Sequence, residues 1–344
     1  MTRILTSMTF LAFLAACGDG QPFFGEDASS ATDGSDLTEN EDDTEGDGGS
    51  IDAGTLLAGT DSPTDTGGIF RFETDKASGG GHVQDVSYDA ETDTFMVDNL
   101  AFDGENVYQR GVLVDSLRSY AVFEADEITP DFLTTNPVEQ IVPYRAVLGV
   151  STNLVDGEPR TSFAIVRTGG YVGYGFGGFV YERSGPVVLP TTGQATFSGD
   201  YGGVQVYTDL AGLRYVTGDM TLDIDFEDFN ANDGIKGRIT NRQVFFENGG
   251  VDNAAVLSDV GWTIVEGVDT LTENGEIVSN VFSTILGDSD QLVTYFSGTF
   301  NGIVAGDTLD IDDGGEIVGV ITMVAEDKDR EISIQETGGA ILYR

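Results

Sequence analysis

The stretch Gly193-Gln194-Ala195-Thr196-Phe197-Ser198-Gly199 alternates apolar with small or polar side chains and is bounded by glycine. Such alternation predicts a half-buried β-strand, and similar segments recur through residues 186–344. The others are Met220 to Phe226, Gly237 to Ile239, Val244 to Phe246, Trp262 to Val265, Thr294 to Gly298, Val318 to Met323 and Ala340 to Tyr343. About eight strands is the number at which a closed barrel is just filled by side chains. We therefore expect an eight-stranded antiparallel β-barrel over 186–344.

The predicted barrel has a clear border on each side. It follows Ser184-Gly185-Pro186-Val187-Val188-Leu189-Pro190, where two close prolines stiffen a connector and do not fit together in a central strand. At the other border, Ile341 and Tyr343 alternate as in a strand. Because a closed barrel has no free edge, we expect this last strand to pair with the first.

Residues 68–185 are also typical of short strands separated by turns. The segments Ile69 to Phe72, Thr94 to Val97, Ser162 to Val166 and Tyr171 to Tyr174 are rich in β-branched and aromatic residues. No segment of the chain sustains a long helical period. The fold class is therefore predicted as all-β, with an N-terminal β domain at 68–185 before the barrel.

The first residues resemble a bacterial lipoprotein signal peptide. Arg3 precedes an apolar run from Ile4 to Leu14, and Ala15 and Ala16 precede Cys17, the only cysteine. This run is too short to span a bilayer and has the length of a signal-peptide h-region. We expect residues 1–16 to be removed and Cys17 to be lipidated, which anchors a protein stably when two or more acyl chains are attached. The alternatives are an ordinary secretory signal or a short buried helix.

Residues 17–67 are predicted to be a disordered acidic tether between the lipid and the folded part. Gly, Ser, Thr and Asn interspersed with Asp and Glu dominate 18–50, and no Lys or Arg occurs between Arg3 and Arg71. Such a composition buries too little apolar surface to offset its ordering entropy. Residues 18 and 19 are Gly and Asp, so Asp does not directly follow the cysteine. That position carries the inner-membrane retention signal of enterobacterial lipoproteins, and its absence favours the outer membrane.

Charge and composition exclude several classes of function. The formal net charge is −43, and so acidic a surface repels nucleic acid and anionic lipid. His82 is the only histidine and follows three glycines. No second histidine or remaining cysteine is available to complete a transition-metal site, and no nucleophile pattern accompanies His82. We assign no catalytic residue and predict that the protein is not an enzyme.

The one pattern that suggests a cofactor is a pair of oxygen-rich turns. Asp225, Asp228, Asn230, Asn232 and Asp233 crowd the turn that ends at Gly234. Calcium takes about six to eight oxygen ligands, so these residues are the candidate Ca²⁺ site. The spacing departs from an EF-hand loop, because no Glu stands at its twelfth position. A second turn holds Asp307, Asp310, Asp312 and Asp313. Plain hairpin turns of an acidic protein are the alternative interpretation of both.

Three motifs of the C-terminal region occur in the order seen in a known family. They are Gly193 to Gly199, then Leu222-Asp223-Ile224-Asp225-Phe226 with Gly234 to Ile239, then Gly298-Thr299-Phe300-Asn301-Gly302 with Gly314 to Gly319. Over roughly 190–344 they resemble the barrel of the transferrin-binding protein B family of surface lipoproteins. Asn301 stands where the family usually has Tyr, and Ile303 where it has Pro. The resemblance implies that residues 68–185 are a handle-like β domain whose exposed loops contribute to partner binding.

The anchor, the tether and the barrel motifs together favour one function. We expect a non-enzymatic outer-membrane lipoprotein, exposed at the cell surface, whose barrel binds an extracellular protein or solute ligand. The resemblance implies a role in metal or haem acquisition. The alternative hypothesis is a calcium-stabilised structural or adhesive protein of the cell envelope.

Overall fold

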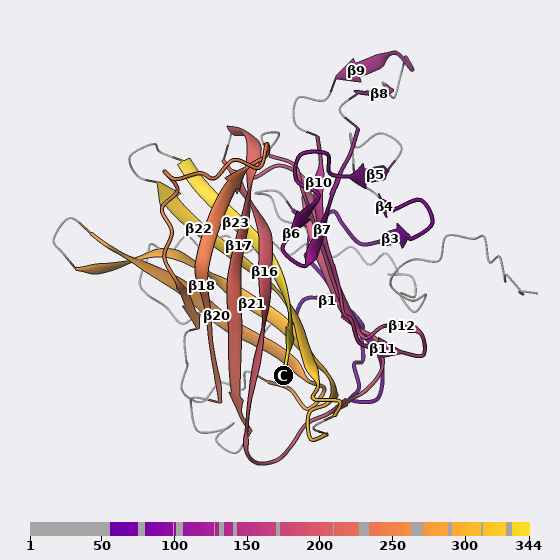
Figure 1. Ribbon diagram of the computed structural model, residues 1–344, viewed down its shortest axis with the longest axis vertical. Helices are drawn as coiled ribbons and strands as arrows, with labels where there is room; N and C mark the ends of the chain where they lie inside the picture. Colours follow the sequence, from indigo (N-terminus) through magenta and orange to yellow (C-terminus); the bar gives the residue numbers. More distant parts are fainter. Residues whose placement is uncertain are drawn as a thin grey trace, which may run out of the picture.

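The computed structural model describes residues 56–74, 80–98, 100, 106–126, 128–130, 134–139, 143–169, 173–208, 210–226, 234–262, 271–287, 291–310, 312–327 and 332–344. Within these ranges every regular element is a β-strand, so the predicted fold class is confirmed. The strands form two large sheets, a closed barrel and a curled sheet beside it (Figure 1).

The closed barrel has eight antiparallel strands. In chain order they are β16 Gln194–Tyr207, β17 Leu210–Asp225, β18 Ile235–Phe246, β19 Val260–Trp262, β20 Glu276–Leu286, β21 Leu292–Asp307, β22 Glu316–Asp327 and β23 Ile332–Tyr343. Each pairs with the next, and β23 returns to pair with β16, for example Thr337 with Val204. The predicted closure of the last strand on the first is therefore confirmed.

Two of the eight strands differ from those predicted. Residues 237–239 and 244–246, predicted as two strands, belong to the single strand β18, whose pairing with β17 shifts at Thr217/Asp219. That irregularity lets Ile239 and Val244 both face the interior although five positions separate them. Strand β20 was not predicted. Its buried positions include Ser279 and Ser283 beside Ile277 and Val281, and these serines weaken the apolar alternation in the sequence.

The barrel has two distinct ends. The turns that join β16 to β17, β20 to β21 and β22 to β23, together with residues 247–259, lie at one end, which we call the tip end. The turns after β17 and β21 and the last residue of β23 lie at the opposite end, which we call the linker end.

The curled sheet is formed by ten strands of the N-terminal region. They are β1 Ala58–Gly59, β2 Ile69–Phe72, β3 Val86–Asp89, β4 Thr94–Val97, β5 Val107–Arg110, β6 Ser116–Leu117, β7 Tyr120–Glu124, β10 Arg145–Val150, β13 Thr161–Arg167 and β14 Gly177–Arg183. Their order is β1-β2-β14-β13-β10-β7-β5-β4-β3, with β6 paired to β7. Two small hairpins stand apart, β8 Ile128–Pro130 with β9 Pro137–Glu139, and β11 Leu154–Val155 with β12 Glu158–Pro159.

The predicted strand from Tyr171 to Tyr174 is wrong where it can be compared. Gly173 and Tyr174 form a turn, and β14 begins only at Gly177. Gly173 and Gly175 have φ of 48° and 82°, which lie in the left-handed region and interrupt an extended strand.

Buried apolar side chains form three clusters, because alternate residues of a strand face opposite sides of a sheet. One fills the barrel, and one lies on the face of the N-terminal sheet turned away from the barrel. The third lies between the two bodies and takes residues from both, such as Val147 and Phe163 from the sheet and Val204 and Ile341 from the barrel. The outer wall of the barrel is thus partly a buried surface.

The connector between the bodies is held at the linker end. Strand β15 (Val187–Val188) pairs in parallel with Gly306–Asp307 of β21. Nearby, the buried Arg183 guanidinium donates to the carbonyl oxygens of Asn274 and Val304 in the barrel region, at 2.7 and 2.9 Å. It also donates to the carbonyls of Thr64 and Gly67, both at 2.9 Å, so residues 64–67 are fixed to this end.

Candidate binding surface

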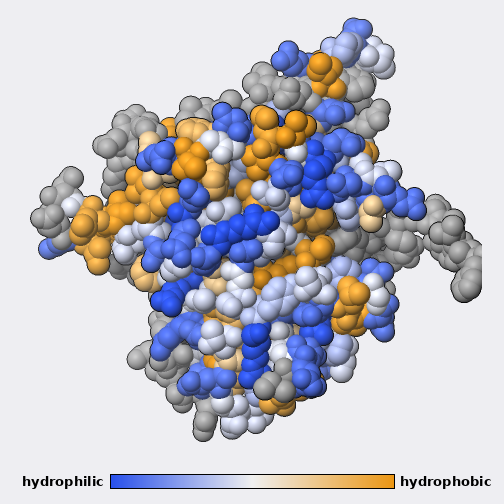
Figure 2. Space-filling view, in the orientation of Figure 1, coloured by the Kyte–Doolittle hydropathy of each residue, from blue (hydrophilic) through white to orange (hydrophobic). Residues whose placement is uncertain are grey.

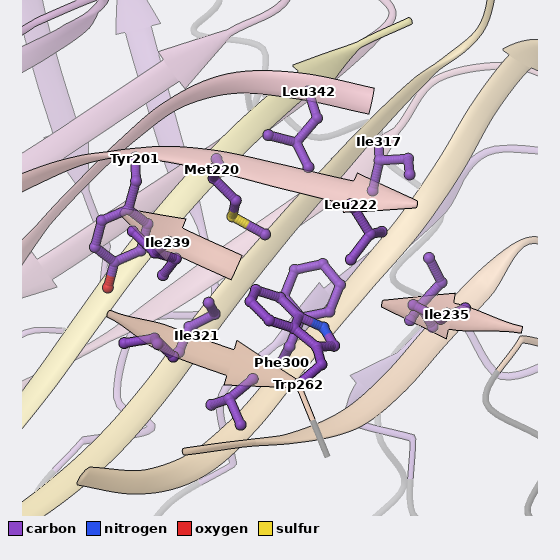
Figure 3. Close-up of a cluster of buried hydrophobic side chains, with 14 of the residues drawn as sticks. Tyr201, Met220, Leu222, Ile235, Ile239, Trp262, Phe300, Ile317, Ile321 and Leu342 are labelled. Atoms are coloured by element: carbon purple, nitrogen blue, oxygen red, sulfur yellow. The ribbon is translucent and has the colours of Figure 1, made fainter. Parts of the chain in front are cut away.

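The interior of the barrel towards the linker end is filled by large apolar side chains (Figure 3). The rings of Trp262 and Phe300 meet edge to face with centroids 5.4 Å apart. Phe300 lies against Gly302 and Gly319, where an added Cβ would come within 2.6 and 2.3 Å of its ring. Glycine at these inward positions gives the ring its space. Because the interior is packed, a ligand would bind on the outer surface of the molecule.

Towards the tip end the interior holds a buried polar network centred on Glu336. The buried Glu336 carboxylate accepts hydrogen bonds from Tyr201 (2.8 Å), Gln205 (2.7 Å) and Arg242 (2.5 Å). Burial and the neighbouring Glu336 hold the pKa of Tyr201 well above its usual value, so its hydroxyl stays a donor. The network joins β16, β18 and β23, and its geometry is that of a structural brace.

Residues 247–259 cross the tip end of the barrel. Arg242 donates to the Ser258 carbonyl at 2.9 Å, and Arg214 contacts Asp252 at 3.4 Å. The Arg214 guanidinium also lies 4.3 Å from the centre of the Phe246 ring, within cation–π range. Two arginines of the barrel wall thereby hold this crossing segment.

Exposed apolar side chains gather at the tip end. They are Val112 and Leu113 between β5 and β6, Val251 and Val256 in the crossing segment, and Leu286, Leu292 and Val293 of the β20–β21 hairpin. We call these seven residues the tip surface. Leu286 and Leu292 are 68% and 70% exposed, and they oppose each other where the hairpin projects from the barrel (Figure 1). In Figure 2 hydrophobic colour marks this projecting hairpin.

Both bodies of the molecule contribute to the tip surface. A Cβ at Gly249 would lie 3.6 Å from the Leu113 carbonyl oxygen and from the Val114 side chain, so the loop after β5 touches the crossing segment. Apart from the tip surface, the β8–β9 hairpin exposes Ile128 and Val138, at 64% and 42%, and projects beyond the sheet (Figure 1). Exposed apolar patches of this kind are typical of interaction sites.

The chain as a whole is strongly anionic, and many of its few arginines are paired with carboxylates of the same chain. Eight arginines form ion pairs with carboxylates: Arg71, Arg110, Arg118, Arg145, Arg160, Arg167, Arg214 and Arg242. The chain has 59 acidic and 16 basic residues, so most of the acids have no basic side chain to pair with. A partner would therefore meet an apolar surface set in a strongly anionic one.

The predicted calcium turn lies mostly outside the described residues. Of its five candidates only Asp225 is described, and its carboxylate accepts a hydrogen bond from Gln194 at 2.5 Å. The other four are Asp228, Asn230, Asn232 and Asp233. No group of three or more His, Cys, Asp or Glu in the described ranges is placed to hold a metal ion. Calcium binding at 225–233 stays a prediction.

The second acidic turn has a structural explanation. Asp307 accepts hydrogen bonds from the backbone N–H groups of Leu309 and Asp310, at 2.8 and 3.2 Å. Asp313 accepts from the Asp307 N–H at 3.0 Å and from Arg160 at 2.5 Å. These carboxylates close the turn and bind it to the N-terminal sheet, which favours the plain-turn interpretation here.

The remaining predicted residues are placed as follows. Cys17 lies outside the described residues. His82 lies outside the regular strands, where its backbone N–H donates to the Gly177 carbonyl at 2.9 Å and its ring lies 5.6 Å from Phe176. Across the described ranges, no helix has the length and apolar character needed to cross a membrane.

The tip surface was not predicted from the sequence. Leu286 and Leu292 stand in strands that also carry buried apolar residues, such as Val281 and Phe296. Only the projection of the hairpin beyond the barrel places them in solvent, and short-range sequence patterns carry no signal for that.

No protein-family model and no curated protein matches the chain. Among solved structures, it is similar to a double mutant of the vaccine antigen transferrin-binding protein B from Haemophilus parasuis Hp5 (10% identity, TM-score 0.35), covering 76% of this chain and 42% of that one. It is also similar to a single mutant of the same antigen (10%, TM-score 0.31; 76% and 66% covered) and to intact Ap-TbpB with its N and C lobes (11%, TM-score 0.31; 82% and 61% covered). The chain thus spans less than two thirds of each of these structures. At these scores the eight-stranded barrel is established by the chain's own strand pairing, and the likeness to transferrin-binding protein B is one of fold.

Proposed function

We propose that the chain is a lipid-anchored, non-enzymatic protein of the outer-membrane surface that binds an extracellular protein ligand through the tip surface. The observation that carries this proposal is the gathering of exposed apolar residues at one end, with contributions from both bodies. A packed barrel interior supports binding on the outside of the molecule.

The expected anchor is compatible with this arrangement. The described chain begins at Leu56, beside β1 at the edge of the N-terminal sheet. A lipid on Cys17 would be joined to that edge through residues 17–55, a spacer that leaves the tip surface free to meet external ligands.

Paired variants of the mature lipidated protein test the binding site. Leu286→Asp with Leu292→Asp places two charges on the tip surface. Leu154→Asp with Leu309→Asp is the matched control, because those leucines are 60% and 62% exposed at the linker end. Proteins retained from extracellular fluid are compared by mass spectrometry. We expect the specific set retained by the wild type to be lost in the tip variant and kept in the control.

Two outcomes contradict the proposal. Equal retention by both variants would place the binding site elsewhere, and robust turnover on a broad hydrolase panel would assign an enzymatic activity instead. The anchor is tested separately with Cys17→Ser, which we expect to release the protein from the membrane fraction. Variant protein that still sediments with membranes after a high-salt wash would rule out Cys17 as the anchor.

A further inference from the structure

The barrel closes along the seam between its first strand, β16, and its last, β23, and this seam is rich in glycine. Gly202 pairs with Gly339, and Gly203 pairs with Gly338. Glycine in a strand loses more conformational entropy on folding than other residues and has no side chain to pack. Intrinsic strand preference is therefore weak where the barrel must close.

The same seam is interrupted by a side chain from the other body. The pairs Ser198↔Tyr343 and Tyr201↔Ala340 share one register, so Asp200 stands opposite Ile341, yet these two residues are not paired. The Tyr120 hydroxyl of β7 lies between them. It donates to the Asp200 carbonyl oxygen at 2.6 Å and accepts from the Ile341 N–H at 2.9 Å.

The outer face of the seam is shaped to receive this tyrosine. A Cβ on Gly202 would lie 2.8 Å from the Tyr120 ring, so only glycine gives the ring its position. The opposite residue, Gly339, does the same for Phe163, where a Cβ would come within 2.3 Å of the ring. The two rings meet edge to face with centroids 4.9 Å apart. The glycine pair Gly202–Gly339 thus leaves the space in which the rings of Tyr120 and Phe163 pack against the barrel.

The turn that presents Tyr120 is itself tied to the barrel. Arg118 has φ of 57°, an uncommon conformation for a residue with a long side chain. Its guanidinium forms ion pairs with Asp200 of β16 and Asp219 of β17. The carboxylate of Asp219 is also held by Asn241 at 2.6 Å. The turn is therefore fixed on the strand that Tyr120 bridges.

We propose that Tyr120 is an intramolecular latch of the barrel: its hydroxyl supplies the hydrogen-bonded bridge between β16 and β23, so the seam closes fully only when the N-terminal sheet is docked. Release of the sheet leaves two glycine-rich strand edges joined by fewer bonds. The barrel then opens at this seam before it opens elsewhere.

Backbone hydrogen exchange in the mature protein tests the latch. Tyr120→Phe removes only the hydroxyl, and with it both hydrogen bonds of the bridge, to Asp200 and from Ile341. Loss of even one hydrogen bond corresponds to about a tenfold change in an opening equilibrium. We therefore expect exchange at Ile341 and in the facing part of β16 to accelerate by at least about tenfold, with much smaller changes in β20 and β21. Tyr181→Phe is the control, because Tyr181 belongs to the same interface cluster but stacks on Phe179.

A second variant disturbs the latch from the barrel, by displacing the Tyr120 ring. Gly202→Ala keeps the Tyr120 hydroxyl but pushes its ring outwards, and we expect the same local acceleration along the seam. The proposal is overturned if, in both variants, exchange at Ile341 accelerates over the wild type no more than exchange of the amides of β20 and β21. It is also overturned if Tyr181→Phe produces the same pattern as Tyr120→Phe.

Discussion

The interior of the barrel and the interface between the two bodies are both fully buried, but they are built differently. Apart from the Glu336 network and small polar residues such as Ser279 and Ser283, the interior is apolar and is specified by size, as where Phe300 packs against glycine. The interface combines an apolar cluster with buried charges. Arg71 binds Glu276 with 2.6 and 3.1 Å contacts, and Arg167 binds Glu73 at 2.8 Å. The interior therefore stabilises a barrel, whereas the interface specifies what docks on it and in which position.

The buried carboxylate of Glu316 illustrates the difference. It begins β22 at the linker end and accepts hydrogen bonds from three neutral groups of the N-terminal sheet: Thr161 at 2.6 Å, Ser151 at 2.8 Å and Asn153 at 2.5 Å. Without the sheet this carboxylate would lose all three donors. At this point the outer wall of the barrel therefore depends on the N-terminal region, and not on water, for its hydrogen bonds.

The largest expected effect is that residues 186–344 do not form a stable monomer on their own. Their outer wall would expose Val204, Val206, Leu213, Tyr215, Ile303, Val318, Val320 and Ile341, all buried against the sheet. Loss of this burial is comparable with the whole stability of a domain, about 5–15 kcal/mol. We expect aggregation or a non-cooperative thermal transition by circular dichroism and size-exclusion chromatography, while residues 56–344 unfold cooperatively. A monomeric, cooperatively folding 186–344 fragment would show that the interface is dispensable.

The next effect concerns the Arg71–Glu276 pair. Arg71→Met leaves Glu276, 2% exposed, without its cation, which costs about 3–5 kcal/mol for a buried pair. The double variant Arg71→Met with Glu276→Met removes both charges and should recover much of that loss. Urea unfolding of the two single variants and the double variant gives the coupling free energy. Additive losses would mean that the two side chains do not depend on each other.

The sequence predicts the barrel better than the interface because the two depend on different kinds of information. Alternation at 193–199 and 340–343 is local, and it correctly predicts two strands and their closure. The contact of Tyr120 with Ile341 joins residues 221 positions apart and has no local pattern. The tip surface likewise depends on where a hairpin leaves the barrel. Local patterns therefore predict strands, whereas interfaces and exposed patches follow from their assembly.

A smaller effect is expected at Glu182, on the face of the N-terminal sheet turned away from the barrel. Burial raises its pKa to about 8, and its one close polar partner among the described hydrogen bonds is the Ser162 hydroxyl at 3.0 Å. The folded state therefore holds a proton that the unfolded state releases near its usual pKa of 4.5. Stability conferred by this proton is complete below pH 4.5 and is lost as the pH rises through 8.

Glu182→Gln removes this pH dependence while keeping the shape of the side chain. We expect the variant to be more stable than the wild type at pH 7, by about 3 kcal/mol, and equal to it at pH 4. Thermal unfolding between pH 4 and 9 measures the difference. A gap that stays constant with pH would show that Glu182 does not titrate in this range. Glu73→Gln, which removes the charge from a carboxylate bonded to Arg167, is the contrasting variant and should destabilise the protein.

The smallest effect is expected at Arg118, where an exposed ion pair and an unusual backbone conformation oppose each other. Exposed ion pairs contribute about 0.2–1 kcal/mol, and a left-handed conformation costs a residue other than glycine about 1 kcal/mol or more. Arg118→Gly removes the pairs with Asp200 and Asp219 but adopts φ near 57° without strain. The two changes should nearly cancel, with a change in the free energy of unfolding within about 0.5 kcal/mol, whereas Arg118→Ala loses the pairs and keeps the strain. Urea unfolding in low salt and in 1 M NaCl separates the two, because salt weakens the exposed pairs and leaves backbone strain unchanged. If Arg118→Gly were as damaging as Arg71→Met, this exposed contact would belong with the buried charges that specify the interface.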